Sequence, residues 1–196
     1  MGENHAGTPV AARVRRLEER LIEAGLVSEP DLDEILARYL AGASPLNGAR
    51  IVARAWLDDD FRSGLLHDAN ATITDLGLSM RSGLQEQPLK VVANTPREHN
   101  VIVCTLCSCY PIGLLGPSPS WYKSEAYRSR VVREPRAVLR EFGLTLPEDV
   151  EIVVRDSSSE RRYLVLPLRP AGTEGMSEDD LVGVVTREGL IGTAAV

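Results

Sequence analysis

Three cysteines within six residues constrain this chain more than any other feature of its sequence. Cys104, Cys107 and Cys109 lie in 101-VIVCTLCSCYPIGLLG-116, and no cysteine occurs elsewhere in the 196 residues. An odd number of thiols cannot all pair in disulfides within one chain. A Cys-x-x-Cys pair followed two residues later by a third cysteine can instead bring three sulfur ligands to one metal ion. The fold must therefore hold this segment as one tight loop.

The composition predicts a globular protein that works in a reducing compartment. Hydrophobic residues make up 43% of the chain and charged residues 26%, and the length suffices for one core plus an appendage. No apolar run reaches the roughly 18 residues of a membrane span. Charged residues stand near the N-terminus where a signal peptide would need its apolar core, so we expect a cytoplasmic location. The net charge of -6 argues against a general nucleic-acid binder.

The N-terminal residues 1–45 are predicted to form a helical arm. Apolar residues recur at spacings of four, three and four along residues 10–21, which gathers them on one helix face. Gly25 is placed to end this helix, and a second helix is predicted from Pro30 to Gly42. Two helices of this size cannot build a core of their own. We expect the arm to bury its apolar stripes against the body of the protein or a partner chain.

Residues 46–196 are predicted to form a mixed α/β layered body. Strand patterns cover residues 89–94, 100–103, 150–156 and 162–168, and the last two are predicted to pair with each other across a polar connection. Helical patterns cover residues 47–56, 58–77, 124–143 and 177–189, and Pro135 is expected to restart the third of these. The predicted class is α+β, a helical arm followed by a body that carries the metal loop.

The cysteine spacing is compatible with a structural zinc site. His99 lies five residues before Cys104 and could complete a tetrahedral set of ligands, in which case the chain would be a zinc-binding interaction module. Free buried thiols or a redox-active pair are further alternatives. Spacing alone does not decide among these readings.

The Cys107-Ser108-Cys109 run favours a different metal. It places two backbone amide nitrogens between two sulfur ligands, and without their protons these nitrogens could join both sulfurs in one plane through five-membered chelate rings. Cys104 would cap the plane from one side and leave a sixth position open. Anionic nitrogen and sulfur ligands in this arrangement suit trivalent cobalt or iron better than tetrahedral zinc.

At these residues the sequence strongly resembles the α-subunit of nitrile hydratase and its relative, the cysteine-bearing subunit of thiocyanate hydrolase. The resemblance extends over most of the chain beyond the arm. The matching stretches are 48–56, 101–110, 121–143, 156–167 and 169–175.

The resemblance implies a non-corrin metal centre, with cobalt(III) favoured over iron(III). Cobalt members of the family carry Thr and Tyr where this chain has Thr105 and Tyr110. The implied oxidation products are a sulfinic acid at Cys107 and a sulfenic acid at Cys109. The implied ligands are the sulfurs of Cys104, Cys107 and Cys109 and the amide nitrogens of Ser108 and Cys109.

The implied activity is the addition of water to a nitrile, which gives an amide. A Lewis-acidic metal polarises the nitrile carbon, and the nucleophile is either an activated water or the sulfenate oxygen of Cys109. Gln85 stands where the family often has a glutamine that reaches toward the site, although it can equally be an ordinary loop residue. Hydrolysis of thiocyanate is the alternative activity within the family.

The resemblance also implies partner proteins. In the family, arginines of a separate β-subunit pair with the oxidised cysteines, so this chain is expected to be half of a catalytic unit. A metal-insertion activator protein is a further possible partner. On this reading His99 is a surface or packing residue. The arginines of residues 128–140 are expected to form local ion pairs on a solvated helix, or else to contact a partner subunit.

One departure from the family bears on the substrate. Nitrile hydratases commonly follow the cysteine motif with Trp-Pro-x-Leu-Gly, whereas this chain has Ile112 and Gly113 in place of the tryptophan and proline. Loss of an indole this close to the metal ligands should enlarge the pocket. The sequence therefore predicts a bulky or heteroaromatic nitrile as the substrate.

Overall fold

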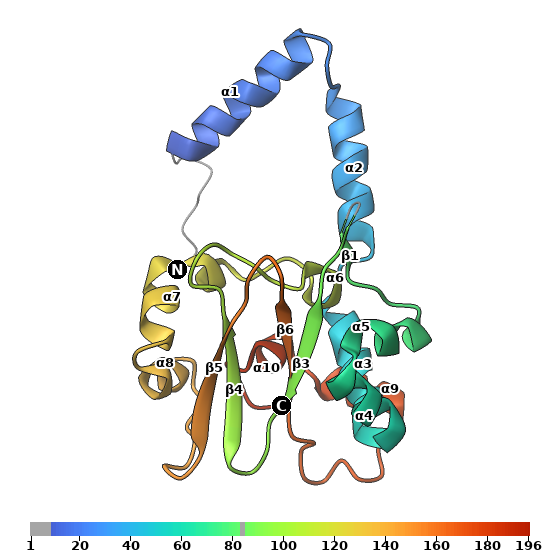
Figure 1. Cartoon of the computed structure of the whole chain (residues 1–196), viewed down its shortest axis with the longest axis vertical. Coiled ribbons are helices and arrows are strands. Elements are labelled where there is room, and N and C mark those ends of the chain that lie inside the picture. The colour runs from blue at the N-terminus through green and yellow to red at the C-terminus, as the bar shows by residue number, and fades with distance from the viewer. Residues whose placement is uncertain (1–8, 83–84) are drawn as a thin grey trace. The chain divides into compact units, whose positions relative to one another are not determined.

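The computed structural model of the chain describes residues 9–82 and 85–196 (Figure 1), with the side chains of residues 38–41, 82 and 85 left out. The chain divides into two compact units, Met1–Gly42 and Ala43–Val196. None of the described helices is long and apolar enough to cross a membrane.

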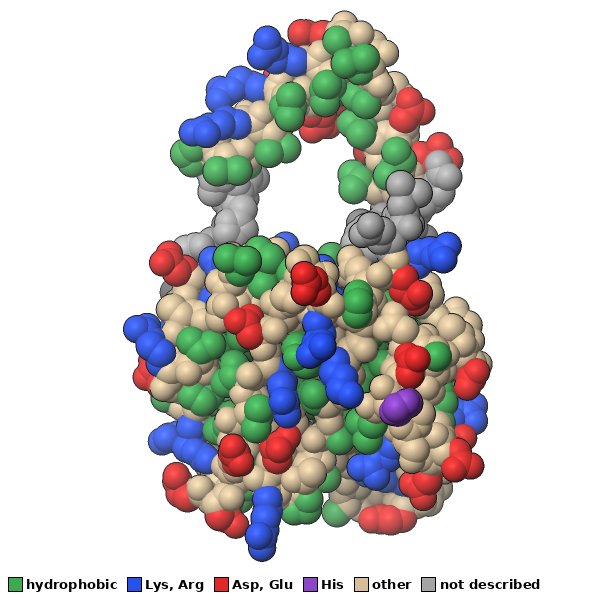
Figure 2. Space-filling model, in the orientation of Figure 1, with side chains coloured by type: hydrophobic (Ala, Val, Ile, Leu, Met, Phe, Trp, Pro, Cys, Tyr) green, Lys and Arg blue, Asp and Glu red, His purple; other side chains and the backbone are tan. Residues whose placement is uncertain are grey.

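The first unit contains the two helices predicted for the arm, α1 (Pro9–Glu23) and α2 (Glu29–Ala41). Gly25 ends α1 with a φ of 66°, a left-handed conformation that glycine adopts without strain. Helix α1 buries none of its residues, and Val10 and Leu17 expose 66% and 59% of their surface. Figure 2 shows these hydrophobic side chains along the arm. The apolar stripe of α1 is thus left uncovered within the described chain.

Short, well-capped helices surround the strands of the second unit. Ser44 caps the first of them through its side chain, Asp58 caps the next, and Pro135 begins α8 as predicted. The helix predicted over residues 177–189 is divided in two at Val185 and Thr186. The helices are α3 (Pro45–Leu57), α4 (Asp59–His67), α5 (Ala69–Thr72), α6 (Ile112–Leu115), α7 (Glu125–Val131), α8 (Pro135–Glu141), α9 (Glu178–Val184) and α10 (Arg187–Ile191), with 3-10 turns η2 (Ile73–Leu76) and η3 (Ser120–Lys123).

The main strands form two parallel pairs. Strand β3 (Leu89–Ala93) pairs with β6 (Arg162–Leu166), and β4 (Glu98–Val103) pairs with β5 (Glu151–Asp156). The prediction that residues 150–156 and 162–168 pair with each other was wrong. Each run contains three consecutive apolar residues, Ile152–Val154 and Leu164–Leu166, and such runs are typical of strands that pair in parallel under covering helices. Strands β1 (Arg81–Ser82) and β2 (Gln85–Glu86) form a small antiparallel pair.

The strands lie in the order β5, β4, β6, β3, with helices on both sides (Figure 1). Helix α8 packs on β5, helices α4 and α5 pack on β3, and α10 packs on β6. One continuous hydrophobic core runs between the strands and these helices. The predicted α+β class is confirmed. Because β4 and β5 are parallel and in register from Glu98 with Glu151 to Val103 with Asp156, their carboxyl ends meet at one edge. Cys104 follows directly at that edge.

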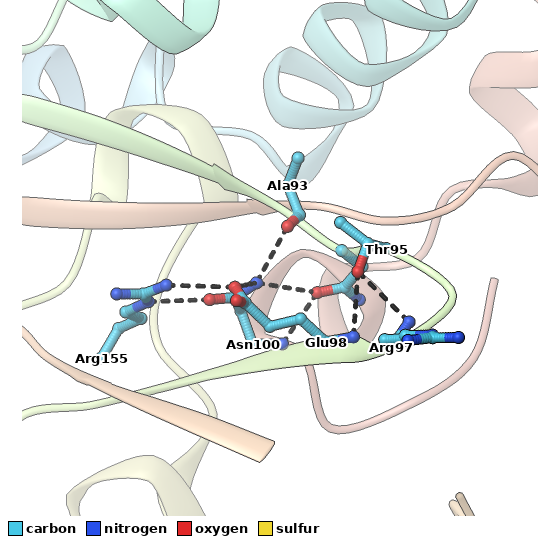
Figure 3. Close-up of polar contacts among 7 residues, drawn as sticks. Ala93, Thr95, Arg97, Glu98, Asn100 and Arg155 are labelled. Atoms are coloured by element: carbon cyan, nitrogen blue, oxygen red, sulfur yellow. Dashed lines mark hydrogen bonds and ion pairs between the residues drawn. The ribbon is translucent and has the colours of Figure 1, made fainter. Parts of the chain in front are cut away.

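A polar junction fixes the opposite end of β4 (Figure 3). The fully buried Asn100 donates through Nδ2 to the Ala93 carbonyl at 3.0 Å and to Glu98 Oε1 at 3.2 Å. Its Oδ1 accepts from Arg155 Nε at 2.7 Å. One side chain thereby connects β3, β4 and β5. This junction holds the register of the strand whose far end leads into the cysteines.

Candidate metal centre

The three cysteine sulfurs lie together at the end of β4. The Sγ atoms of Cys104 and Cys107 are 3.4 Å apart, those of Cys107 and Cys109 are 3.3 Å apart, and all three lie within 4.8 Å of one another. Cys104 and Cys109 are buried, whereas Cys107 is exposed. The Cys107 amide also donates to Cys104 Sγ at 3.3 Å. The segment is therefore folded around its own sulfurs.

The thiols polarise one another. Hydrogen bonds from the Cys109 and Cys104 thiols, together with those from the backbone amides of Ser108 and Cys109, lower the pKa of Cys107 to about 7. Burial, followed by the hydrogen bond to Cys107, raises the pKa of Cys109 to about 12, against the opposing charge of Arg162. The exposed Cys107 thiol therefore ionises more readily than the buried Cys109 thiol. The two amides predicted as ligands already point at the sulfur cluster.

Asp156 anchors the start of the loop from the neighbouring strand. Its carboxylate accepts from the Thr105 amide at 2.9 Å and from the Thr105 hydroxyl at 2.6 Å. The Ser157 amide donates to the Val103 carbonyl at 2.7 Å and extends the pairing of β4 and β5 by one step. The parallel pair therefore determines where the cysteine loop leaves the sheet.

Three side chains from the segment of η3 and α7 hold carbonyl groups in and beside the loop. The Tyr127 hydroxyl donates to the Ile102 carbonyl at 2.6 Å, and the Tyr122 hydroxyl donates to the Cys109 carbonyl at 2.9 Å. Arg128 Nη1 donates to the Cys107 carbonyl at 3.1 Å. Tyr122 is fully buried, and its ring packs edge-on against Tyr110 with centroids 5.0 Å apart. The loop is shaped by hydrogen bonds from outside as well as by its own sulfurs.

A pocket of about 350 Å³ opens beside the cysteines. Leu106 is 89% exposed and forms its apolar wall, while the connection between β5 and β6 forms its polar wall. The lining residues are Cys104, Leu106, Cys107, Asp156, Ser157, Ser158 and Ser159.

The donor atoms fit a nitrogen and sulfur metal centre better than a zinc site completed by histidine. Among the His, Cys, Asp and Glu residues that the structure describes, those grouped around this point are the three cysteines. His99 is buried elsewhere: its Nε2 bonds the Gly192 carbonyl at 2.8 Å and its Nδ1 bonds the Asn94 amide at 3.2 Å. The expectation that His99 packs rather than ligates agrees with this placement. The nitrogen donors near the sulfurs are the loop's own amides.

A family model described as "Nitrile hydratase, alpha chain" matches residues 8–194. The chain belongs to the nitrile hydratase α-chain family. It is 49% identical over 185 residues to the low-molecular-weight cobalt-containing nitrile hydratase α-subunit of Rhodococcus rhodochrous, covering 94% of this chain and 88% of that protein. It is 44% identical over 186 residues to the γ-subunit of thiocyanate hydrolase from Thiobacillus thioparus, covering 91% of this chain and 76% of that protein. A solved iron-type nitrile hydratase from Comamonas testosteroni Ni1 superposes with a TM-score of 0.86 at 41% identity, covering 95% of this chain and 89% of that chain.

The structure also places the other residues that the resemblance to the nitrile hydratase α-chain family singled out. Ser108 is exposed and lies between the exposed Cys107 and the buried Cys109. Gln85 lies in β2, and its side chain falls outside what the structure describes. Ile112 begins α6, is partly buried against the core, and does not line the pocket beside Cys107.

The arginine-rich segment divides into two roles. Arg130 forms the predicted local ion pairs, at 2.6 Å to both Glu134 and Glu141. Arg128, two residues earlier, turns instead to the Cys107 carbonyl. Sequence reasoning missed this contact together with the roles of Tyr122, Tyr127 and Asp156. These four residues lie in the stretches 121–143 and 156–167, which resemble the nitrile hydratase α-chain family. Their place in those stretches is the one sequence signal that could have marked them as part of the site.

Proposed function

We propose that this chain is the metal-bearing subunit of a nitrile hydratase, which adds water to a nitrile at a cobalt(III) centre to form the amide. The observation that carries the proposal is the triangle of three sulfurs with the Ser108 and Cys109 amides facing it. The 49% identity to a cobalt-containing α-subunit supports the choice of metal, although an iron-type structure also matches well. Thr105 and Tyr110 in the motif favour cobalt.

The chain's own residues would hold the metal and shape its surroundings. Cys104, Cys107 and Cys109 supply sulfur, and Ser108 and Cys109 supply amide nitrogen. When bound, the cobalt would supply a Lewis acid that polarises the nitrile carbon. Asp156 and Tyr122 keep the loop in one shape, so the ligands need little rearrangement.

Two sources of the nucleophile fit the residues of the loop. We propose Cys107 as a sulfinic acid and Cys109 as a sulfenic acid, formed with an oxidant of the peroxide or dioxygen class. The sulfenate oxygen of Cys109 could attack the nitrile carbon, or it could accept a proton from an attacking water. Gln85 is proposed to orient the nitrile or this water from β2.

The partner in this proposal is a β-type nitrile hydratase subunit. Residues 1–45 act as a helical arm and residues 46–196 as the catalytic body. The exposed apolar stripe of α1 is a surface that such a subunit would cover. The exposed side of Cys107 is where arginines of that subunit would meet the oxidised sulfur. Metal delivery by an activator protein is part of the same proposal.

The substrate is proposed to be a bulky or heteroaromatic nitrile, because Ile112 and Gly113 replace the family's Trp-Pro. Ile112 packs partly against the core and does not line the pocket beside Cys107, so any effect of this position on the substrate has to be tested directly. Measuring kcat/KM for acetonitrile and for a heteroaromatic nitrile in Ile112→Trp tests this. The larger substrate should lose at least tenfold more than the smaller one, and an equal effect on both would remove the argument.

The deciding experiment is to express the full chain with its β-type subunit in cobalt-containing medium, measure the bound metal, and assay nitriles and thiocyanate side by side. Cobalt with amide formation supports the proposal. Thiocyanate hydrolysis is the second candidate, favoured by the 44% identity to the thiocyanate hydrolase γ-subunit, and carbonyl sulfide and ammonia as products would select it. Zinc at full occupancy without cobalt or iron would instead indicate a non-catalytic zinc-binding module.

A further inference from the structure

Arg128 occupies an unusual place among the arginines of its segment. From α7 it donates through Nη1 to the carbonyl of Cys107, the residue at the centre of the sulfur triangle. Its Nε is buried and has no hydrogen-bond partner among the residues that the structure describes. Arg133, five residues later, also donates to a carbonyl, but to that of Ser129 within its own segment. The two arginines make the same kind of bond in different places.

The charge on the metal loop explains why a cation at this position matters. Cysteine binds a metal ion as the thiolate, so a loaded loop carries three negative charges against the two positive charges of cobalt(II), and the site keeps a net negative charge. The carboxylate of Asp156, bonded to Thr105, adds a fourth negative charge at the start of the loop. A charged donor is roughly twice as strong as a neutral one toward such a group, because its charge acts together with its hydrogen bond.

A second cation lies near the cluster but is directed elsewhere. The charge of Arg162 lowers the pKa of Cys109, whereas its Nη1 is bonded to the Ser158 carbonyl. The two tyrosines that hold nearby carbonyls, Tyr122 and Tyr127, are neutral. Arg128 therefore combines a direct bond to the loop backbone with a full positive charge.

We propose that Arg128 is a positioning residue of the metal centre: it orients the Cys107 carbonyl and offsets the negative charge that the loop gathers when its cysteines bind the metal. This inference rests on the proposed function, since it applies to a loop that binds a metal ion. On this proposal, Arg128 strengthens cobalt binding both through its positive charge and through the hydrogen bond that fixes the conformation of the loop. The two contributions can be separated by substitution.

The test uses the full-length chain, stripped of metal under reducing conditions and titrated with cobalt(II). Bound cobalt is followed by the sulfur-to-cobalt absorption bands and by metal analysis. Arg128→Lys keeps the charge, Arg128→Gln keeps a donor without the charge, and Arg128→Met removes both. Arg133→Gln is the matched control. Hydrogen exchange of residues 104–110 in the metal-free chain reports the shape of the loop separately.

We expect Arg128→Gln to bind cobalt about tenfold more weakly, within the range seen when outer partners of metal ligands are removed. Arg128→Met should be weaker still and should exchange its loop amides faster. Arg128→Lys should stay within about threefold of the wild type, because it restores the charge, and Arg133→Gln should match the wild type.

Two results would overturn the inference while leaving the proposed function intact. One is wild-type cobalt affinity in Arg128→Gln and Arg128→Met, and the other is an equal loss in Arg128→Lys and Arg128→Gln, which would show that shape alone matters. Failure of the wild-type chain to bind cobalt, both alone and together with the β-type subunit and the activator protein, would reject the proposed function and this inference together.

Discussion

The hydroxyl of Tyr122 offers the sharpest test of how the body of the protein shapes the metal loop. Tyr122 is fully buried, and its hydroxyl donates to the Cys109 carbonyl at 2.9 Å. Tyr122→Phe removes this one donor and keeps the ring, which contacts Tyr110 at 5.0 Å and Tyr127 at 5.9 Å between centroids. The substitution therefore changes a hydrogen bond without opening a large cavity.

The expected loss of stability follows from the environment of that bond. Cys109 is buried, so its carbonyl would lose its tyrosine partner in a place that water reaches poorly. Leaving a buried acceptor unpaired costs about 1–3 kcal/mol. For a chain of this size each kcal/mol lowers the melting temperature by about 2–4 °C. We expect a decrease of about 2–12 °C in the metal-free chain, and about tenfold weaker cobalt binding because the freed carbonyl belongs to a metal ligand.

Thermal denaturation and cobalt titration of Tyr122→Phe measure the two effects. Tyr163→Phe is the matched control, since Tyr163 is half-buried in β6 and its hydroxyl forms none of the hydrogen bonds found among the described residues. This control should change stability by less than about 0.5 kcal/mol. Unchanged stability and cobalt affinity in Tyr122→Phe, or an equal loss in the control, would refute the reasoning.

Three further predictions concern the rest of the chain. Burial lowers the pKa of His99, so the imidazole binds its second proton more tightly in the unfolded chain than in the folded one. Stability should therefore fall as the pH drops below the ordinary histidine value of 6.5, and thermal melts of His99→Gln should show a flatter acid limb if this histidine is responsible. Deleting residues 1–42 should leave the body folded but weaken its complex with the β-type subunit, and unchanged affinity in calorimetry would reject the arm as an interface. Mass spectrometry of active protein should find two added oxygen atoms on Cys107 and one on Cys109, and unmodified thiols in a fully active sample would contradict the assigned chemistry.

The sequence predicted correctly those features that depend on residues close together in the chain, namely the helices and the cysteine loop. The apolar spacing of residues 10–21 predicted α1, and Pro135 marked the start of α8, because helix periodicity and proline geometry act over a few residues. The cysteine spacing likewise placed three sulfurs in one loop. Strand pairing failed because β5 and β6 adjoin in sequence, whereas each pairs with a strand more than 50 residues earlier. The contacts from Tyr122 and Asp156 to the loop depend on that pairing and could not be read from spacing.

The different exposure of the two faces of the metal loop leads to a final argument about assembly. On one face Cys104 and Cys109 are buried, and the Cys109 carbonyl is held from beneath by Tyr122. On the other face Cys107 is exposed, and Leu106 extends 89% of its surface into solvent. The chemistry proposed here requires a site from which bulk water is excluded, whereas Cys107 is exposed on this face. The described body closes one face of the loop and leaves the other open, and we propose that a β-type subunit supplies the missing wall. The shape of the loop thus points to the same kind of partner as the family to which the chain belongs.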